Sequence, residues 1–127
     1  MWKKVIVLLA ALAVFTLLLG SCAVTSAPTS SGPTVHMGQT DFIEHSVTLH
    51  KGDKLTLQDN VNSTHIITNG SWVNGSPQPK TEAGAPTVNV TINSSGESTA
   101  IGPFTTAGTF HLYCTVHPEM NLTVVVQ

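Results

Sequence analysis

From residue 35 onward, apolar and polar residues alternate in short runs along the chain. In residues 109–114 the apolar positions Phe110, Leu112 and Cys114 lie two residues apart, which is the spacing along one face of a β-strand. Glycine, proline, asparagine and aspartate separate the runs, as expected between strands. The strands expected on this basis are residues 35–39, 46–50, 54–58, 65–68, 87–92, 98–101, 109–114 and 121–126.

Eight short strands with turn residues between them predict an all-β domain, either a sandwich or a barrel. Residues 70–86 contain three prolines and three glycines, so we expect a long loop there, with room for one turn of helix. The pattern begins at residue 35, and residues 35–127 are therefore the expected domain. Residues 22–34 are rich in serine, threonine, proline and glycine and predict a flexible tether.

The first 21 residues have the composition of a secretory signal rather than of a folded domain. Lys3 and Lys4 provide a positive start, residues 5–19 are apolar apart from Thr16, and small residues follow. The apolar run is too short, and wrongly flanked, for a transmembrane helix. We therefore expect residues 1–21 to act as a signal that places the rest of the chain outside the cytoplasm.

The end of this segment, Leu19-Gly20-Ser21-Cys22, resembles the lipobox of bacterial lipoproteins. Proteins of that class are cleaved just before the cysteine, which then carries the lipid. The resemblance implies that Cys22 anchors the chain to the outer face of the cytoplasmic membrane. Two alternatives stay open, a plain secretory signal with a chance cysteine and an uncleaved membrane anchor.

The charge balance restricts the classes of partner. Without residues 1–21 the chain keeps three lysines, no arginine and seven acidic residues, which gives a formal charge of −4. That balance argues against nucleic acid, because phosphate binding needs clustered lysine and arginine. It also argues against electrostatic docking on anionic lipid.

Three side chains with metal-binding chemistry follow one another near the C-terminus in the spacing Cys-x2-His-x2-Met. They are Cys114, His117 and Met120, and Pro118 between them helps to stop a strand or helix. On a tight loop, such side chains can converge on one point. A thiolate, two imidazoles and a weak thioether are the donors of a trigonal copper site with a long axial methionine, whereas zinc, calcium and magnesium prefer other donors.

The second imidazole of such a site must come from elsewhere in the chain. His65 stands out among the candidates because it lies where a loop, residues 62–64, enters a strand. His111 has the opposite strand parity to Cys114 and should face outward. We expect surface positions for His36, His45, His50 and His111, since exposed histidine is common.

Taken together, these motifs resemble the plastocyanin and amicyanin branch of the cupredoxins. The matching features are residues 52–57, then His65, then Gly-Thr-Phe-x-Leu-Tyr-Cys-x-x-His-Pro-x-Met at residues 108–120. The resemblance covers residues 35–127, and the short ligand loop looks more like that of amicyanin. It implies an eight-stranded Greek-key β-sandwich, cupredoxin-like, that holds one copper ion cycling between Cu(I) and Cu(II). The implied copper ligands are His65, Cys114, His117 and Met120.

The resemblance also implies a function, the shuttling of single electrons between a redox protein donor and a redox protein acceptor. The edge of His117 should then approach the surface among apolar residues such as Pro118, where a partner docks. Tyr113 has outward parity and marks either a second electron route or an ordinary strand residue. Trp72 either shields the site from water or packs as a satellite core residue. Ile66 stands where many relatives have asparagine, so their reduction potential is not carried over.

Three other functions compete with the electron shuttle. A copper carrier or storage protein would release its copper readily to a chelator. An enzyme would need an open position for substrate, which Met120 closes, and the sequence lacks both the His-x-His pairs of multicopper oxidases and the second loop cysteine of a binuclear site. A metal-free sandwich module that binds other proteins is distinguished by Cys114→Ser, because colour and copper content that persisted in this variant would show that the site assignment is wrong. We therefore expect a protein that is not an enzyme and has no small-molecule substrate.

Overall fold

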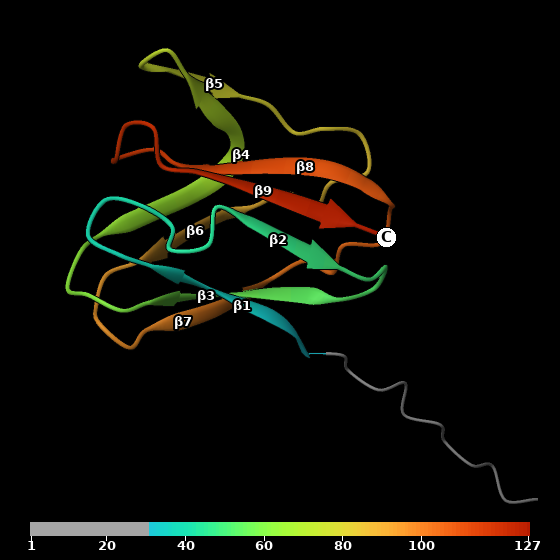
Figure 1. Cartoon of the computed structure of the whole chain (residues 1–127), viewed down its shortest axis with the longest axis horizontal. Coiled ribbons are helices and arrows are strands. Elements are labelled where there is room, and N and C mark those ends of the chain that lie inside the picture. Colours follow the sequence, from blue (N-terminus) through green and yellow to red (C-terminus); the bar gives the residue numbers. More distant parts are fainter. Residues whose placement is uncertain (1–30) are drawn as a thin grey trace, which may run out of the picture.

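The computed structural model describes residues 31–127, which form nine β-strands in two sheets (Figure 1). The expected all-β class is confirmed, and within this range there is no helix that could cross a membrane. The expected signal at residues 1–21 and Cys22 lie outside the described residues. The strands are β1 (Ser31–Met37), β2 (Ser46–Leu49), β3 (Lys54–Asp59), β4 (His65–Val73), β5 (Ser76–Pro79), β6 (Asn89–Ile92), β7 (Ser98–Ile101), β8 (Gly108–Cys114) and β9 (Asn121–Val126).

The two sheets differ in size and in the order of their strands. The smaller has the order β1-β3-β7, and the larger has the order β2-β9-β8-β4-β5, with β6 also paired to β4. The pairs β1–β3 and β2–β9 are parallel, and the other pairs are antiparallel. Because β4 and β8 are antiparallel neighbours, the first residues of β4 and the last residues of β8 lie at the same end of the strands of the large sheet.

The core lies between the sheets and is built from alternate residues of each strand. Phe110, Leu112 and Cys114 of β8 are buried, as are Leu122 and Val124 of β9. Burying one such apolar side chain fully contributes roughly 1.5–3 kcal/mol to stability. The two-residue periodicity therefore also decides that Cys114, the last residue of β8, points into the protein.

The expectation of a long loop at residues 70–86 is wrong for its first part. The fourth strand continues to Val73, turns at Asn74 and Gly75, and pairs with β5, which raises the strand number from eight to nine. Asn74 and Gly75 have φ values of 51° and 75°, as a two-residue hairpin turn of the Asn-Gly type requires. The strand β5 tolerates Pro77 and Pro79 because it is an exposed strand at the end of its sheet.

The first strand also begins earlier than expected. Pairing with β3 starts at Ser31, not at residue 35, so residues 31–34 extend the sheet instead of continuing the tether. Gly32 allows this pairing, because a Cβ atom there would collide with the carbonyl oxygen of Lys54. The composition of this segment did not predict a strand, because it contains a glycine and a proline.

Candidate metal centre

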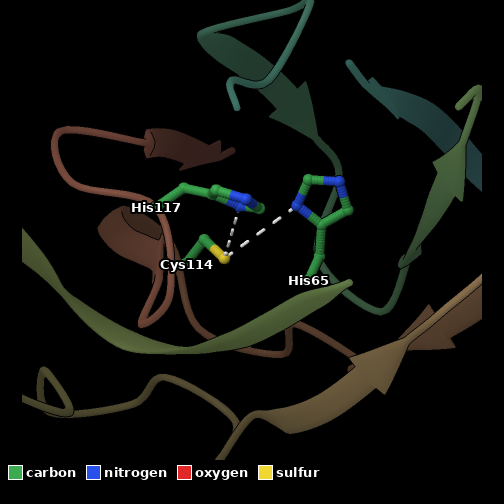
Figure 2. A group of neighbouring side chains, drawn as sticks. All are labelled: His65, Cys114 and His117. Atoms are coloured by element: carbon green, nitrogen blue, oxygen red, sulfur yellow. Dashed lines mark hydrogen bonds between the residues drawn. The ribbon is translucent and has the colours of Figure 1, made fainter. Parts of the chain in front are cut away.

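Two neighbouring strands and one loop bring three potential metal ligands together. His65 is the first residue of β4, and Cys114 is the last residue of β8. Cys114 pairs with Ile67, which lies two residues after His65 on the same strand. The loop that leaves β8 carries His117 back over this end of the strands. Figure 2 shows the two imidazole rings facing the sulfur of Cys114 from different sides.

The distances between these side chains fit a single metal ion. The Sγ of Cys114 lies 3.5 Å from Nδ1 of His117 and 3.9 Å from Nδ1 of His65, and the three ligand atoms all lie within 4.8 Å of one another. Bonds of about 2.3 Å to sulfur and about 2.0–2.1 Å to nitrogen, at an angle of about 120°, place the donor atoms about 3.8 Å apart. The arrangement therefore suits a metal with trigonal coordination.

The ligand loop is held tight by its own backbone. The N–H of Cys114 donates to the carbonyl of Met120 at 3.0 Å, and the N–H of Met120 donates to the carbonyl of His117 at 3.3 Å. Glu119 adopts a positive φ of 63°, which bends the chain between these bonds. Met120 is fully buried as a result and lies in the same core cluster as Cys114.

The centre is shielded from water except on one side. His65, Cys114 and Met120 have no exposed surface, whereas His117 is partly exposed. Within residues 31–127, Cys114 is a free cysteine. A thiol that is buried between two imidazoles is protected from oxidation by solvent and is available to a metal.

The environment of His65 favours its neutral form. Burial lowers the pKa of His65 below its ordinary value of 6.5, and the charge of His117 lowers it further. The Asp59 carboxylate and the backbone of Gly38 raise the pKa of His65, but burial has the larger effect. A neutral imidazole keeps one lone pair, which is what a metal ligand must offer.

A backbone hydrogen bond links the two ligand-bearing segments directly. The N–H of Thr115 donates to the carbonyl of Ile66 at 2.8 Å, so the residue after Cys114 is tied to the residue after His65. This bond does not depend on the side chain at position 66. The two ligand-bearing segments are therefore linked even though the side chain of Ile66 is apolar and cannot form a hydrogen bond.

The β4–β5 hairpin braces the ligand loop from the outside. The indole N–H of Trp72 donates to the carbonyl of Cys114 at 2.8 Å, and the side chain of Asn121 exchanges two hydrogen bonds with the backbone of Trp72. The N–H of Gly75 donates to the carboxylate of Glu119 at 2.6 Å. These bonds connect a hairpin missed in the sequence to the loop that carries His117.

Tyr113 differs from its expected environment. It lies outside the core cluster, as its strand parity predicts, but only 3% of it is exposed. Trp72 packs against it edge to face, with ring centroids 6.1 Å apart. The expected outward Tyr113 is therefore buried, and Trp72, which packs against it, is itself partly exposed.

The other four histidines lie away from the metal centre, near the surface. Each faces an acidic side chain, and their side chains are between 36% and 83% exposed. The pairs are His36 with Glu44, His45 with Asp41, His50 with Asp53 and His111 with Glu82.

Comparison with known proteins identifies the fold. No family model matches the sequence, and no curated protein matches it. Among solved structures, amicyanin from Paracoccus versutus aligns over 80% of this chain and 86% of its own, with a TM-score of 0.56 and 17% identity. A purple cupredoxin from Nitrosopumilus maritimus aligns over 75% and 99%, with a TM-score of 0.57 and 16% identity. The chain has a cupredoxin fold.

A third comparison supports the same fold. An oxidised point mutant of amicyanin aligns over 76% of this chain and 83% of its own, with a TM-score of 0.55 and 21% identity. Identities this low establish the shared fold of these cupredoxins and this chain. The donor set of His65, Cys114 and His117 is a property of the chain itself.

Sequence reasoning missed two features near the centre. The hairpin could have been found from Asn74-Gly75, which is a strong hairpin signal between two possible strands. Asp59 could have been noticed because it continues the inward parity of Leu55 and Leu57.

Proposed function

We propose that this protein is a type 1, or blue, copper protein that shuttles single electrons between redox proteins outside the cytoplasmic membrane. The proposed copper ligands are His65, Cys114, His117 and Met120. The observation that carries the proposal is the approach of two Nδ1 atoms to one buried sulfur, at 3.5 and 3.9 Å, in a cupredoxin fold.

The chemistry of the donors supports copper over other metals. Thiolate and thioether sulfur suit Cu(I), and imidazole suits Cu(II), so bound copper would supply a one-electron couple. The absence of carboxylates from the triad disfavours calcium and magnesium. The fold that this chain shares with amicyanin and with the purple cupredoxin also supports copper as the metal.

The residues of the chain would restrict rearrangement and direct the electron. Backbone bonds within the ligand loop, and from Thr115 to Ile66, hold the donors in place before any metal binds. Burial of His65, Cys114 and Met120 keeps these three side chains away from water. The partly exposed His117 is the proposed point of contact with a redox partner.

The test is the optical spectrum of residues 22–127 titrated with Cu(II). We expect one equivalent to bind with an intense blue thiolate-to-copper band. The Cys114→Ser variant should lose that band while keeping its fold by circular dichroism. If the wild-type protein takes up no copper, or if Cys114→Ser stays blue, the proposed centre is wrong.

A copper carrier or storage protein is the second candidate, because the same donors could hold copper for delivery. The buried, braced site favours the shuttle, since a carrier needs a ligand that opens readily. A chelator competition distinguishes the two functions. A shuttle should retain its copper and cycle its colour with reductant, whereas a carrier should surrender the metal.

The proposed location is outside the cytoplasm, with the lipidated Cys22 at the outer face of the cytoplasmic membrane. This proposal rests on the signal-like residues 1–21 and the lipobox-like residues 19–22. We propose further that the protein is not an enzyme, because Met120 as a fourth ligand would leave no open position for a substrate, and its side chain is fully buried in the same core cluster as Cys114.

A further inference from the structure

A buried carboxylate lies behind the proposed copper ligand His65. Asp59 ends β3 and has no exposed surface, and it continues the inward parity of Leu55 and Leu57. Its backbone is fixed on both sides, because its N–H donates to the carbonyl of Glu97 and its carbonyl accepts the N–H of Gly96. The carboxylate is therefore held inside the protein by the strand that carries it.

The hydrogen-bonding capacity of Asp59 and His65 is incompletely used. One oxygen of Asp59, Oδ1, accepts the N–H of Val61 at 2.9 Å, while Oδ2 has no partner. The Nε2 atom of His65 also has no partner and lies 3.9 Å from Oδ1 of Asp59. Buried polar atoms without a partner are uncommon, and an unpartnered imidazole nitrogen beside a buried carboxylate that also has an unpartnered oxygen calls for an explanation.

Few other charged groups surround this pair. The His117 ring lies beside the His65 ring, with centroids 4.9 Å apart, and the backbone of Gly38 is the other polar group that acts on His65, where it raises the pKa of the imidazole. Within residues 31–127 no lysine forms an ion pair with Asp59. Lys54 begins the same strand at its opposite end, about 17 Å away by the strand rise.

We propose that Asp59 is a positioning residue for His65, which keeps the proton of the imidazole on Nε2 and biases bound copper toward Cu(II). This inference rests on the proposed copper site. A neutral imidazole has one N–H and one lone pair. With the proton on Nε2 facing Asp59, the lone pair of Nδ1 faces Cys114, where the metal would be bound.

The negative charge of Asp59 is the reason why we expect bound copper to favour Cu(II). The Cys114 thiolate and the Asp59 carboxylate together match the two positive charges of Cu(II), whereas Cu(I) leaves one negative charge unbalanced in a buried site. An unbalanced buried charge is unfavourable. Carboxylates that orient a metal-binding histidine also raise its basicity as a ligand.

The test compares Asp59→Asn with Asp53→Asn. Both substitutions remove one negative charge, and Asp53 precedes the same strand about 20 Å from Asp59. For Asp59→Asn we expect about 10–100-fold weaker Cu(II) binding. Its reduction potential should rise by 59 mV for each tenfold loss of Cu(II) affinity relative to Cu(I). Asp53→Asn should leave both quantities near the wild-type values.

The metal-free protein provides a readout that does not involve copper. Long-range ¹H–¹⁵N spectra of the wild type should show His65 with its proton on Nε2, and Asp59→Asn should shift the population toward the other tautomer. A wild-type His65 protonated on Nδ1 would overturn the proposal even if the variant failed to fold. An Asp59→Asn protein with the wild-type reduction potential would also overturn the proposal, because the backbone of Gly38 would then be enough to orient the His65 imidazole.

These outcomes are separable from failure of the proposed function. If the wild-type protein binds no copper and shows no blue band, the copper site itself is wrong. If the wild type is blue and only the Asp59→Asn comparison shows no change, the copper site stands and the role of Asp59 does not.

Discussion

At the scale of single residues, the observed role of the Met120 backbone can be separated from the proposed ligand role of its side chain. Its carbonyl oxygen accepts the N–H of Cys114, and this bond holds the ligand loop whatever the side chain does. Its side chain is fully buried in the core cluster. A thioether in such a site is a weak, long ligand that tunes the reduction potential more than it fixes the metal.

We expect Met120→Leu to remain blue but to have a higher reduction potential, because Cu(II) loses a donor while the three strong ligands remain. Leucine and methionine have similar volumes, so the stability loss should be below about 1.5 kcal/mol. A redox titration with thermal unfolding measures both effects. Leu49→Met, a similar exchange at a fully buried position of β2, is the control for the effect of changing one core side chain. An unchanged potential would show that the sulfur of Met120 is not a ligand.

At the scale of elements, the metal centre depends on how β4 changes partners along its length. Its first half pairs with β6 and β8 and brings His65 beside Cys114, and its second half pairs with β5. Gly70 lies at that change, where a Cβ atom would collide with the carbonyl oxygen of Gln78. The hairpin beyond Gly70 reaches the outer side of the ligand loop.

We expect Trp72→Phe to weaken this brace without removing the aromatic cover over Tyr113. The variant loses the indole N–H that donates to the Cys114 carbonyl, which should cost about 0.5–1.5 kcal/mol of unfolding free energy. Urea unfolding measures the loss, and Val73→Ala on the same hairpin is the control, since Val73 is 49% exposed. Equal stability for the two variants would argue against the brace.

At the scale of the whole molecule, the chain enters the domain at the end opposite to the metal centre. Ser31 pairs with Lys54, whereas Met37, at the other end of β1, pairs with Asp59 beside His65. The length of β1 separates these two ends by about 20 Å. Figure 1 shows β1 entering from the side on which the C-terminus lies. A membrane anchor before residue 31 would therefore be joined to the end of the domain that lies opposite to the metal centre.

We expect Cys22→Ala in the full chain to move the protein from the membrane fraction to the soluble fraction. The reason is that the proposed lipid supplies the attachment, about 0.8 kcal/mol for each buried methylene. Immunoblotting of separated fractions measures the change. Cys114→Ser, which alters the other cysteine, should stay with the membrane. If Cys22→Ala also stays there, an uncleaved N-terminal anchor is favoured.

Much of the architecture follows from local pattern. Alternation of apolar and polar residues predicted the all-β class and most strand positions, because a strand buried on one face needs that period. It failed at residues 31–34 and 70–79, where glycine and proline interrupt the alternation of apolar and polar residues. There the strands exist because neighbouring backbone offers hydrogen bonds, which composition does not reveal.

The sequence predicted that Cys114, His117 and Met120 lie on one loop, because a loop this short can bring nearby side chains together. The approach of His65, 49 positions earlier than Cys114, is different in kind. It depends on the register between β4 and β8, and a shift of one residue would turn His65 to the other face. Asp59 reaches His65 across the two sheets, and such a contact arises only when the core packs.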